Sequence, residues 1–153
     1  MAERITFEAE LERHGSFLFT SSGTSMWPMI RPGKDLVEIT RRPEERLKKY
    51  DVALYRRGSR YILHRVLRVR DGDYVIAGDH NYRREYGITD DQIIGVLSAV
   101  VRDGRRDDLT GLKYRLYTRL WCGLFPVRAA ALWMAGGTRR AAGKAKRVLR
   151  REV

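Results

Sequence analysis

The sequence has a single cysteine, no long apolar run and few acidic residues in its last third. A lone Cys122 cannot form an intramolecular disulfide, and it excludes a cysteine-rich zinc site. The most apolar window, 120–138, is interrupted by Pro126 and Arg128, whereas a spanning helix needs about 20 mostly apolar residues. The N-terminal stretch MAERITFEAELERHG contains acids and no apolar core, so we expect neither a secretory signal nor a membrane anchor there. These absences predict a cytoplasmic protein.

Acidic residues are scarce where basic residues gather, and this asymmetry accounts for the net charge of +12. Residues 1–104 hold 18 Lys and Arg against 16 Asp and Glu, whereas residues 105–153 hold 13 against 3. A basic tail attracts polyanions, and both anionic lipid and nucleic acid fit that charge. We predict peripheral contact with an anionic membrane through residues 113–151 and rank nucleic acid second.

The aromatic part of this tail allows two interpretations. In one, an interfacial helix turns its apolar side chains toward lipid while its arginines reach the headgroups. In the other, the aromatic side chains pack on the rest of the protein, and the two arrangements can be combined. The residues concerned are Trp121, Phe125, Leu132 and Trp133 on the apolar side, and Arg115, Arg119 and Arg128 on the basic side.

Short segments with alternating apolar residues predict a mainly β fold between residues 16 and 102. Glycines after Arg57 and Asp71 favour tight hairpins between them. We expect a small antiparallel sheet or partly open barrel, with a short N-terminal helix and C-terminal helices. The predicted strands are SFLFT, DLVEIT, DVALYRR, RYILHRVLRVR, DYVIAG and QIIGVLSAVVR, and RDGRRDDLTG is predicted as a polar linker. The predicted divisions are 1–15 for the helix (Ala2 to Arg13), 16–104 for the β domain and 105–153 for a basic amphipathic helical tail.

Ser25 lies in the stretch GTSMWPMIRPG and is a candidate nucleophile only if the chain supplies a base. Of the histidines, His14 ends the predicted helix and His80 lies in a turn. His64 lies within a predicted strand, where alternation gives it apolar neighbours on the same side. A histidine held in this way is a candidate base, although an isolated one is more often a core residue bonded to a backbone carbonyl.

Six short motifs follow one another in a specific order along the β region: GTSMWP, GKDLV, YDVALY, HRV, GDHN and IIGV. This series resembles the signal peptidase I and LexA-type serine peptidase clan across about residues 16–102, with its G-x-S-M-x-P, H-R-V and G-D-x-N boxes. The resemblance implies a β-rich peptidase fold. Most bacterial leader peptidases and LexA-type proteins use lysine as the base, whereas the endoplasmic-reticulum type of signal peptidase has histidine in the H-R-V box, as this sequence does.

The resemblance implies a catalytic pair of Ser25 as nucleophile and His64 as base. Histidine titrates near neutrality, so it needs less desolvation than a lysine base. Asp79 matches the G-D position, and Glu85 occupies about the place of the acid that orients the histidine in the endoplasmic-reticulum type. Of the two acids, we rank Asp79 first and expect it to have a role in the architecture of the site. We rank Glu85 second and expect it to orient the histidine.

Three further residues are expected to shape the site around the serine. The backbone N–H of Ser25 is the expected oxyanion donor. Gly23 stands where signal peptidases commonly have a hydroxyl that helps to hold the oxyanion, so either backbone groups form the hole alone or the enzyme is slower. Met26 and Pro28 are expected to stiffen the turn and to offer apolar surface beside the nucleophile.

The sequence thus predicts a serine endopeptidase that cleaves a peptide or protein, without a cofactor or metal, in the cytoplasm or at the inner face of the membrane. The missing anchor argues against general secretory processing. One alternative is a LexA-like self-processing regulatory protein, although no helix-turn-helix precedes the β region. Another is an inactive peptidase-derived module that binds membrane or nucleic acid through its tail.

Overall fold

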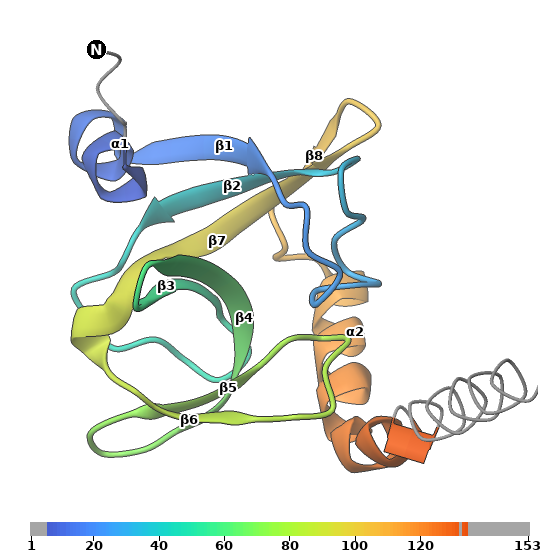
Figure 1. Cartoon of the computed structure of the whole chain (residues 1–153). Coiled ribbons are helices and arrows are strands. Elements are labelled where there is room, and N and C mark those ends of the chain that lie inside the picture. The colour runs from blue at the N-terminus through green and yellow to red at the C-terminus, as the bar shows by residue number, and fades with distance from the viewer. Residues whose placement is uncertain (1–5, 132, 135–153) are drawn as a thin grey trace, which may run out of the picture.

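The protein is mainly β, with one antiparallel sheet and helices at both ends of the described chain (Figure 1). The computed structural model describes residues 6–131, 133 and 134. The strand order is β1-β2-β7-β3-β4-β5-β6, and β8 pairs with β7. The strands are β1 (Ser16–Thr20), β2 (Leu36–Arg41), β3 (Val52–Arg57), β4 (Arg60–Val69), β5 (Tyr74–Ala77), β6 (Glu85–Ile88), β7 (Ile93–Arg102) and β8 (Arg105–Asp107). The helices are α1 (Phe7–His14), the 3-10 helix η1 (Asp90–Gln92) and α2 (Leu112–Gly123), and helical backbone follows at 125–131.

Every segment predicted as a strand forms one, because alternation and turn residues mark these segments locally. The β3–β4 hairpin closes with Arg57 opposite Arg60, and Gly58 has a φ of 60° that favours glycine. The β4–β5 hairpin pairs Val69 with Tyr74 across the predicted turn. The antiparallel sheet and the terminal helices are therefore confirmed.

Two strands escaped prediction because their residues are polar or exposed. β6 lies in the stretch after the G-D-x-N box, and β8 lies in RDGRRDDLTG, which was predicted to be a linker. Asp103 and Gly104 both have positive φ, which makes a tight reversal between β7 and β8. The sheet therefore continues beyond residue 104, where the tail was expected to begin.

Within the described residues, the first helix begins one residue later than the predicted segment, at Phe7, and ends one residue later, at His14. Thr6 caps its N-terminus by accepting a hydrogen bond from the Ala9 N–H, and Gly15 ends it with a φ of 75°. Leu11 is the buried residue of α1 and anchors the helix to the sheet. Residues 2–5 of the prediction lie outside the described part of the chain.

The sheet bends so that apolar side chains form two clusters, and α2 stands along one side of it (Figure 1). The first cluster lies under α1, β1 and β2, and it includes residues from the loop that carries Ser25. The second lies among β3, β4, β5 and β7. Central members are Met26, Ile30, Val37, Ile39, Leu54 and Leu63 in the first, and Leu47, Tyr55, Val66, Tyr74 and Ile76 in the second.

The orientation of the C-terminal helix decides between the two interpretations for part of its aromatic residues. Trp121 and Phe125 do not face outward: the Trp121 indole donates to the backbone oxygen of Asp79, and Phe125 is buried. Arg128 stacks over the Trp121 ring and donates to the same oxygen instead of reaching away from the protein. An indole N–H needs a hydrogen-bond partner when half-buried, and the Asp79 carbonyl supplies it.

Other residues of the predicted apolar and basic sides remain exposed. Trp133 is exposed, as are Arg115 and Arg119, whereas Leu132 lies outside the described residues. No helix in the described ranges combines the length and the apolar character needed to cross a bilayer.

Candidate active site

Ser25 lies in a loop, residues 21–35, that connects β1 to β2 and is fixed to the core. Met26 and Ile30 are buried in the first apolar cluster, which fixes the residues on the C-terminal side of the serine. Backbone hydrogen bonds from Trp27 to Thr24 and from Ile30 to Met26 coil this part of the loop into turns. Ser25 itself is half-buried, so its hydroxyl sits at the surface of a rigid segment.

A buried carboxylate closes the far end of this loop. Asp35 is fully buried and accepts hydrogen bonds at 2.8 Å from both the N–H and the Nε of Arg31. Arg102 of β7 contacts the same carboxylate at 3.1 Å. Burial alone would raise the pKa of Asp35, but these donors outweigh it and hold the pKa below its usual value. The loop is thus tied to the sheet by charge as well as by apolar packing.

The serine packs directly against the G-D-x-N turn. The Ser25 carbonyl accepts a hydrogen bond from the His80 N–H at 2.7 Å. A Cβ added to Gly78 would come within 2.6 Å of the Ser25 carbonyl oxygen and 3.0 Å of Ser25 Cβ. Glycine is required at this position because the side chain of Ser25 occupies the space above it.

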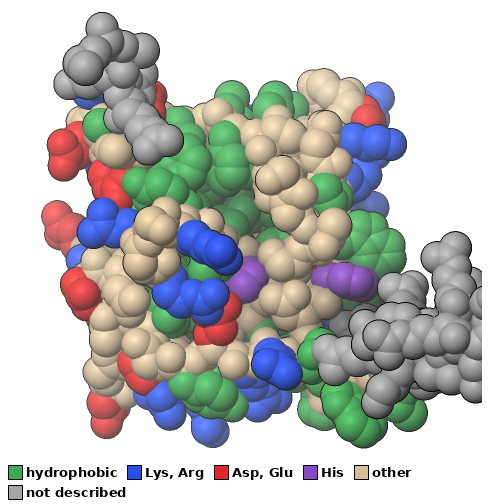
Figure 2. Space-filling view, viewed as in Figure 1, with side chains coloured by type: hydrophobic (Ala, Val, Ile, Leu, Met, Phe, Trp, Pro, Cys, Tyr) green, Lys and Arg blue, Asp and Glu red, His purple; other side chains and the backbone are tan. Residues whose placement is uncertain are grey.

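The same glycine relates the position of the serine to that of His64. Arg65 of β4 pairs with Ala77 of β5. Continuing this antiparallel register by one residue sets His64, which precedes Arg65, opposite Gly78, which follows Ala77, and facing residues of such a pair direct their Cβ atoms to the same side. Because Ser25 lies where a Gly78 side chain would stand, the register brings the serine and the imidazole to the same side of the sheet. Histidine side chains reach the surface on this face of the molecule (Figure 2).

Among the described residues, no hydrogen bond joins Ser25 Oγ to His64. Such contacts commonly tighten only when substrate enters the site. The arrangement places a candidate nucleophile and a candidate base on the same side of the sheet.

Glu85 is the acid that faces His64. Its Oε1 lies 3.2 Å from Nδ1 of the imidazole, and the Tyr55 hydroxyl lies 3.3 Å from the same nitrogen. A carboxylate only accepts hydrogen bonds, so the neutral imidazole carries its proton on Nδ1 toward Glu85. This tautomer leaves the lone pair of Nε2 free to act as a base. Arg57 forms an ion pair with the other oxygen of Glu85 and holds the carboxylate in place.

Burial and charge act in opposite directions on His64. Burial lowers the pKa of the imidazole, and Glu85 partly offsets this by stabilising the charged form, with the net result that the pKa lies below its usual value of 6.5. Burial, followed by the nearby Glu85 carboxylate, raises the pKa of Tyr55 well above its usual value. His64 is therefore neutral, and Tyr55 is protonated, at physiological pH.

Asp79 pairs with an arginine instead of the histidine. Its two carboxylate oxygens accept hydrogen bonds at 2.8 Å from Nε and Nη2 of Arg65. The exposed fractions of the two side chains are 0% and 2%, so this is a fully buried, bidentate ion pair. Burial acts to lower the pKa of Arg65, but Asp79 outweighs it and the pKa lies above its usual value.

The same ion pair joins the β domain to α2. Tyr117 donates to the Asp79 carboxylate at 3.0 Å, and Tyr114 bonds Arg65 at 2.9 Å. Arg65 also contacts the sulfur of Met29 in the serine loop. The turn after β5, the serine loop and α2 thus meet at one buried charge pair, which gives Asp79 an architectural place.

The surroundings of Ser25 leave a free backbone donor. Within residues 6–131, no oxygen accepts a hydrogen bond from the Ser25 N–H. Gly23 is exposed, and as a glycine it has no side chain that could donate a further hydrogen bond to an oxyanion.

Pro28 lies beside a groove of about 940 Å³ that runs toward Lys113 and Tyr117 of α2.

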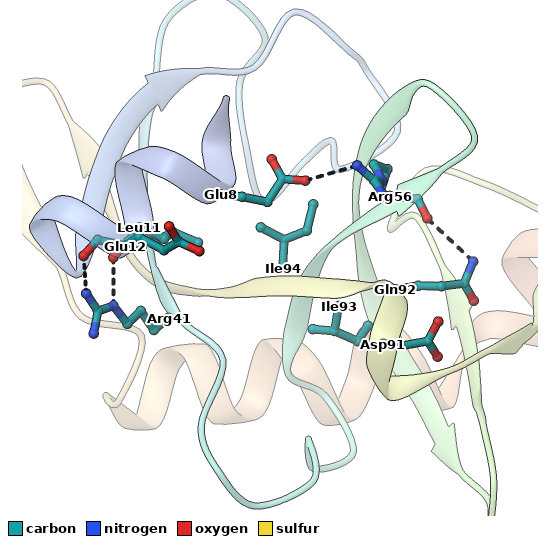
Figure 3. Close-up of a pocket in the computed structure, with 9 residues that line it drawn as sticks. All are labelled: Glu8, Leu11, Glu12, Arg41, Arg56, Asp91, Gln92, Ile93 and Ile94. Atoms are coloured by element: carbon teal, nitrogen blue, oxygen red, sulfur yellow. Dashed lines mark hydrogen bonds and ion pairs between the residues drawn. The ribbon is translucent and has the colours of Figure 1, made fainter. Parts of the chain in front are cut away.

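A second pocket lies at the opposite end of the sheet, away from the serine (Figure 3). Several of its charged side chains have partners: Glu8 contacts Arg56 at 3.6 Å, and Arg41 bonds the backbone oxygen of Leu11 at 2.6 Å. These contacts fasten α1 to the sheet. The pocket therefore has a structural explanation.

Sequence reasoning grouped Ser25, His64, Asp79 and Glu85; the structure packs Ser25 against the Gly78 turn, sets Glu85 against His64 and pairs Asp79 with Arg65. It assigned no role to Arg65, Tyr55 or the tyrosines of α2. The sequence could have indicated a role for Arg65, because a charged residue among the apolar residues of a strand needs a buried partner. It could not have indicated one for Tyr55, because the contact of Tyr55 with His64 depends on the β3–β4 register. Comparison with family models and with curated proteins finds no match for the chain.

The close approach at Gly78 makes a specific prediction. We expect Gly78→Ala to displace the serine loop, because its Cβ would meet the Ser25 carbonyl at 2.6 Å. Overpacking of this kind costs about 1–3 kcal/mol in the free energy of unfolding. Urea denaturation measures the loss, and Gly72→Ala is the control because nothing lies within 4 Å of an added Cβ there. Equal stability of the two variants would contradict the contact.

Proposed function

We propose that the protein is a serine endopeptidase in which Ser25 is the nucleophile, His64 the general base and Glu85 the orienting acid. Two observations support the proposal: Ser25 occupies the space above Gly78, and Nδ1 of His64 faces Glu85 at 3.2 Å. The sheet register, continued by one residue, sets His64 opposite Gly78. The order of the motifs, which resembles the signal peptidase I and LexA-type clan, supports the same assignment. Of the two acids, Glu85 fits the orienting role because Asp79 is engaged by Arg65.

In the proposed reaction, Nε2 of His64 takes the proton from Ser25 Oγ as the oxygen attacks the scissile carbonyl. The Ser25 N–H stabilises the oxyanion, and Glu85 stabilises the imidazolium that forms. The proton passes from Nε2 to the leaving amine as the C–N bond breaks. Water then enters, gives its proton to His64 and hydrolyses the acyl-enzyme, and the proton returns to Ser25.

The groove beside Pro28 and Met29 is the proposed place for the substrate chain. It begins at the serine loop and continues between β8 and α2, with Arg102, Arg105 and Lys113 along it. We place this reaction on the cytoplasmic side of the membrane. Its substrate is a peptide or a protein segment in extended form.

A peptide library tests the proposal directly. The full-length chain is incubated with a mixture of proteome-derived peptides, and mass spectrometry identifies new termini over time. Cleavage at a reproducible sequence pattern supports an endopeptidase, provided that the Ser25→Ala chain produces none of the same products. A mixture that stays intact, or equal cleavage by both chains, would refute the assignment.

The pKa of His64 makes the proposed reaction pH-dependent. His64 can act as a base only when it is neutral, and burial lowers its pKa. We therefore expect kcat/KM to keep its plateau value as the pH falls to 6.5, and to decline only at lower pH, where the imidazole becomes protonated. Glu85→Gln removes an influence that raises this pKa, so the acidic limb should move to lower pH. The maximal rate should fall by about 10²- to 10⁴-fold, because the tautomer is no longer fixed.

The pH profile of kcat/KM for the wild-type and variant chains measures both effects. Glu45→Gln is the matched control, since the Glu45 side chain is 84% exposed and lies away from the site. An acidic limb that stays in place, or moves to higher pH, in Glu85→Gln would contradict the role of Glu85.

A further inference from the structure

A row of exposed aliphatic side chains follows one side of α2 and the helical residues after it. We call it the leucine stripe: Leu112, Leu116, Leu120, Leu124 and Val127. Their exposed fractions are 71%, 51%, 62%, 51% and 66%, so each gives at least half of its surface to solvent. At 100° per residue, a helix places these positions within an arc of about 120°. They therefore form one continuous apolar strip.

The inner side of the same helix is fixed, so the stripe cannot turn inward. Tyr117 and Trp121 stack with ring centroids 5.8 Å apart and bond Asp79 through their polar atoms. Thr118 and Phe125 are buried at 4% and 5% exposure. Rotation of α2 would break the contacts around the buried Arg65 charge. The outward position of the stripe is thus set by the architecture of the site.

The charged residues of the helix that carries the stripe are all basic. Arg115 and Arg119 are exposed and border the stripe, and Lys113 lies within its arc. The sequence from 109 to 151 contains no Asp or Glu, although Asp51 and Asp108 lie near Arg115 and Arg119. An apolar strip with a basic margin is typical of helices that lie in the interface of anionic bilayers.

Two other partners for the stripe, a second copy of the chain and the chain's own C-terminal residues, would bring positive charge next to its arginines. A second copy of the chain, placed stripe to stripe, would bring the arginines of both copies together. The chain's own residues 135–153 hold 7 Lys and Arg against 1 Glu, so they carry the same sign as the stripe's margin. Exposed apolar strips of this extent are uncommon on proteins without a partner. Anionic lipid satisfies both the apolar surface and the charge.

We propose that the leucine stripe docks the protein on the surface of an anionic bilayer. The aliphatic side chains enter the boundary between headgroups and acyl chains, to a depth of about 5–10 Å. The arginines meet lipid phosphates. Because the inner side of α2 holds the Asp79 turn, docking also fixes the orientation of the Ser25 site to the membrane plane. This inference stands whether or not the site hydrolyses peptides.

Vesicle co-sedimentation with the full-length chain tests the proposal. The vesicles contain phosphatidylcholine alone or phosphatidylcholine mixed with phosphatidylglycerol. Wild type should bind the mixed vesicles and bind the zwitterionic ones much more weakly. Leu116→Gln/Leu120→Gln keeps the net charge but removes apolar surface, and we expect the partition coefficient to fall by about 100-fold. The comparison is made at high salt, which screens purely electrostatic attraction of the basic tail.

A second pair of exposed leucines supplies the matched control. Leu18 and Leu36, with exposed fractions of 55% and 39%, lie on β1 and β2, and Leu18→Gln/Leu36→Gln should bind as wild type does. Equal binding by the stripe variant and wild type would overturn the proposal, as would no binding of wild type to mixed vesicles. The oligomeric state, measured by sedimentation without lipid, gives another outcome that would overturn the proposal. If wild type is a dimer and the stripe substitutions dissociate it, the surface binds a second copy of the chain.

Discussion

We expect Ser25→Ala and His64→Ala each to reduce peptide hydrolysis by about 10⁴- to 10⁶-fold while the fold stays intact. A serine without its base is a weak nucleophile, and a base without the serine has no oxygen to activate. The two residues act as a unit, so the double variant should be no slower than either single one. Steady-state kinetics on a peptide identified from the library measure the rates.

Matched substitutions separate catalysis from general damage. Ser59 lies exposed in the β3–β4 turn and His14 lies exposed at the end of α1, so Ser59→Ala and His14→Ala should keep the wild-type rate. Circular dichroism and thermal unfolding check that each variant folds. If His64→Ala keeps most of its activity, the base is another group. Losses that add in the double variant would indicate that the two residues act independently.

The second large effect concerns stability. We expect Asp79→Asn to lower the free energy of unfolding by about 3–5 kcal/mol, because it leaves the charge of Arg65 buried without its counterion. Arg65 is completely buried, so water cannot replace the lost carboxylate. The substitution keeps the size of the side chain, so packing changes little. Urea unfolding followed by fluorescence measures the difference.

An exposed ion pair provides the comparison. Asp103 contacts Arg31 at 3.0 Å, but its side chain is 76% exposed, so Asp103→Asn should cost less than about 1 kcal/mol. Combining Arg65→Met with Asp79→Asn should recover much of the lost stability, because the buried charge is then gone. An Asp79→Asn chain as stable as the Asp103→Asn chain would show that the pair does not hold the site together.

Local patterns in the sequence were enough for most of the sheet. Alternation marks the predicted strands because a strand with one buried side must repeat every second residue. Glycine at position 58 marked the first hairpin for a local reason as well, since its φ is positive. β6 and β8 lack alternation, and only pairing with β5 and β7 makes them strands.

Spacing alone does not separate Asp79 from Glu85 as the acid facing His64, and the resemblance was needed to assign Glu85 that role. The geometry depends on which strand each residue follows. Glu85 pairs with Ile76 in the sheet and turns toward the imidazole, whereas Asp79 leaves β5 and meets Arg65. The sequence left open which side of α2 packs on the protein for a similar reason, since the hydrogen-bond partner of Trp121 lies 42 residues away.

The sequence by itself determined the antiparallel strands, the hairpin turns and the concentration of positive charge after residue 104. These follow from near neighbours and from residue chemistry, whereas the candidate pair Ser25 and His64 is what the order of the motifs implies through a resemblance. The tertiary structure decided that Ser25 fills the space above Gly78, that Glu85 faces the histidine, and that the leucine stripe points outward. Each of these depends on the register between segments far apart in the chain, and periodicity within a segment carries no information on that register.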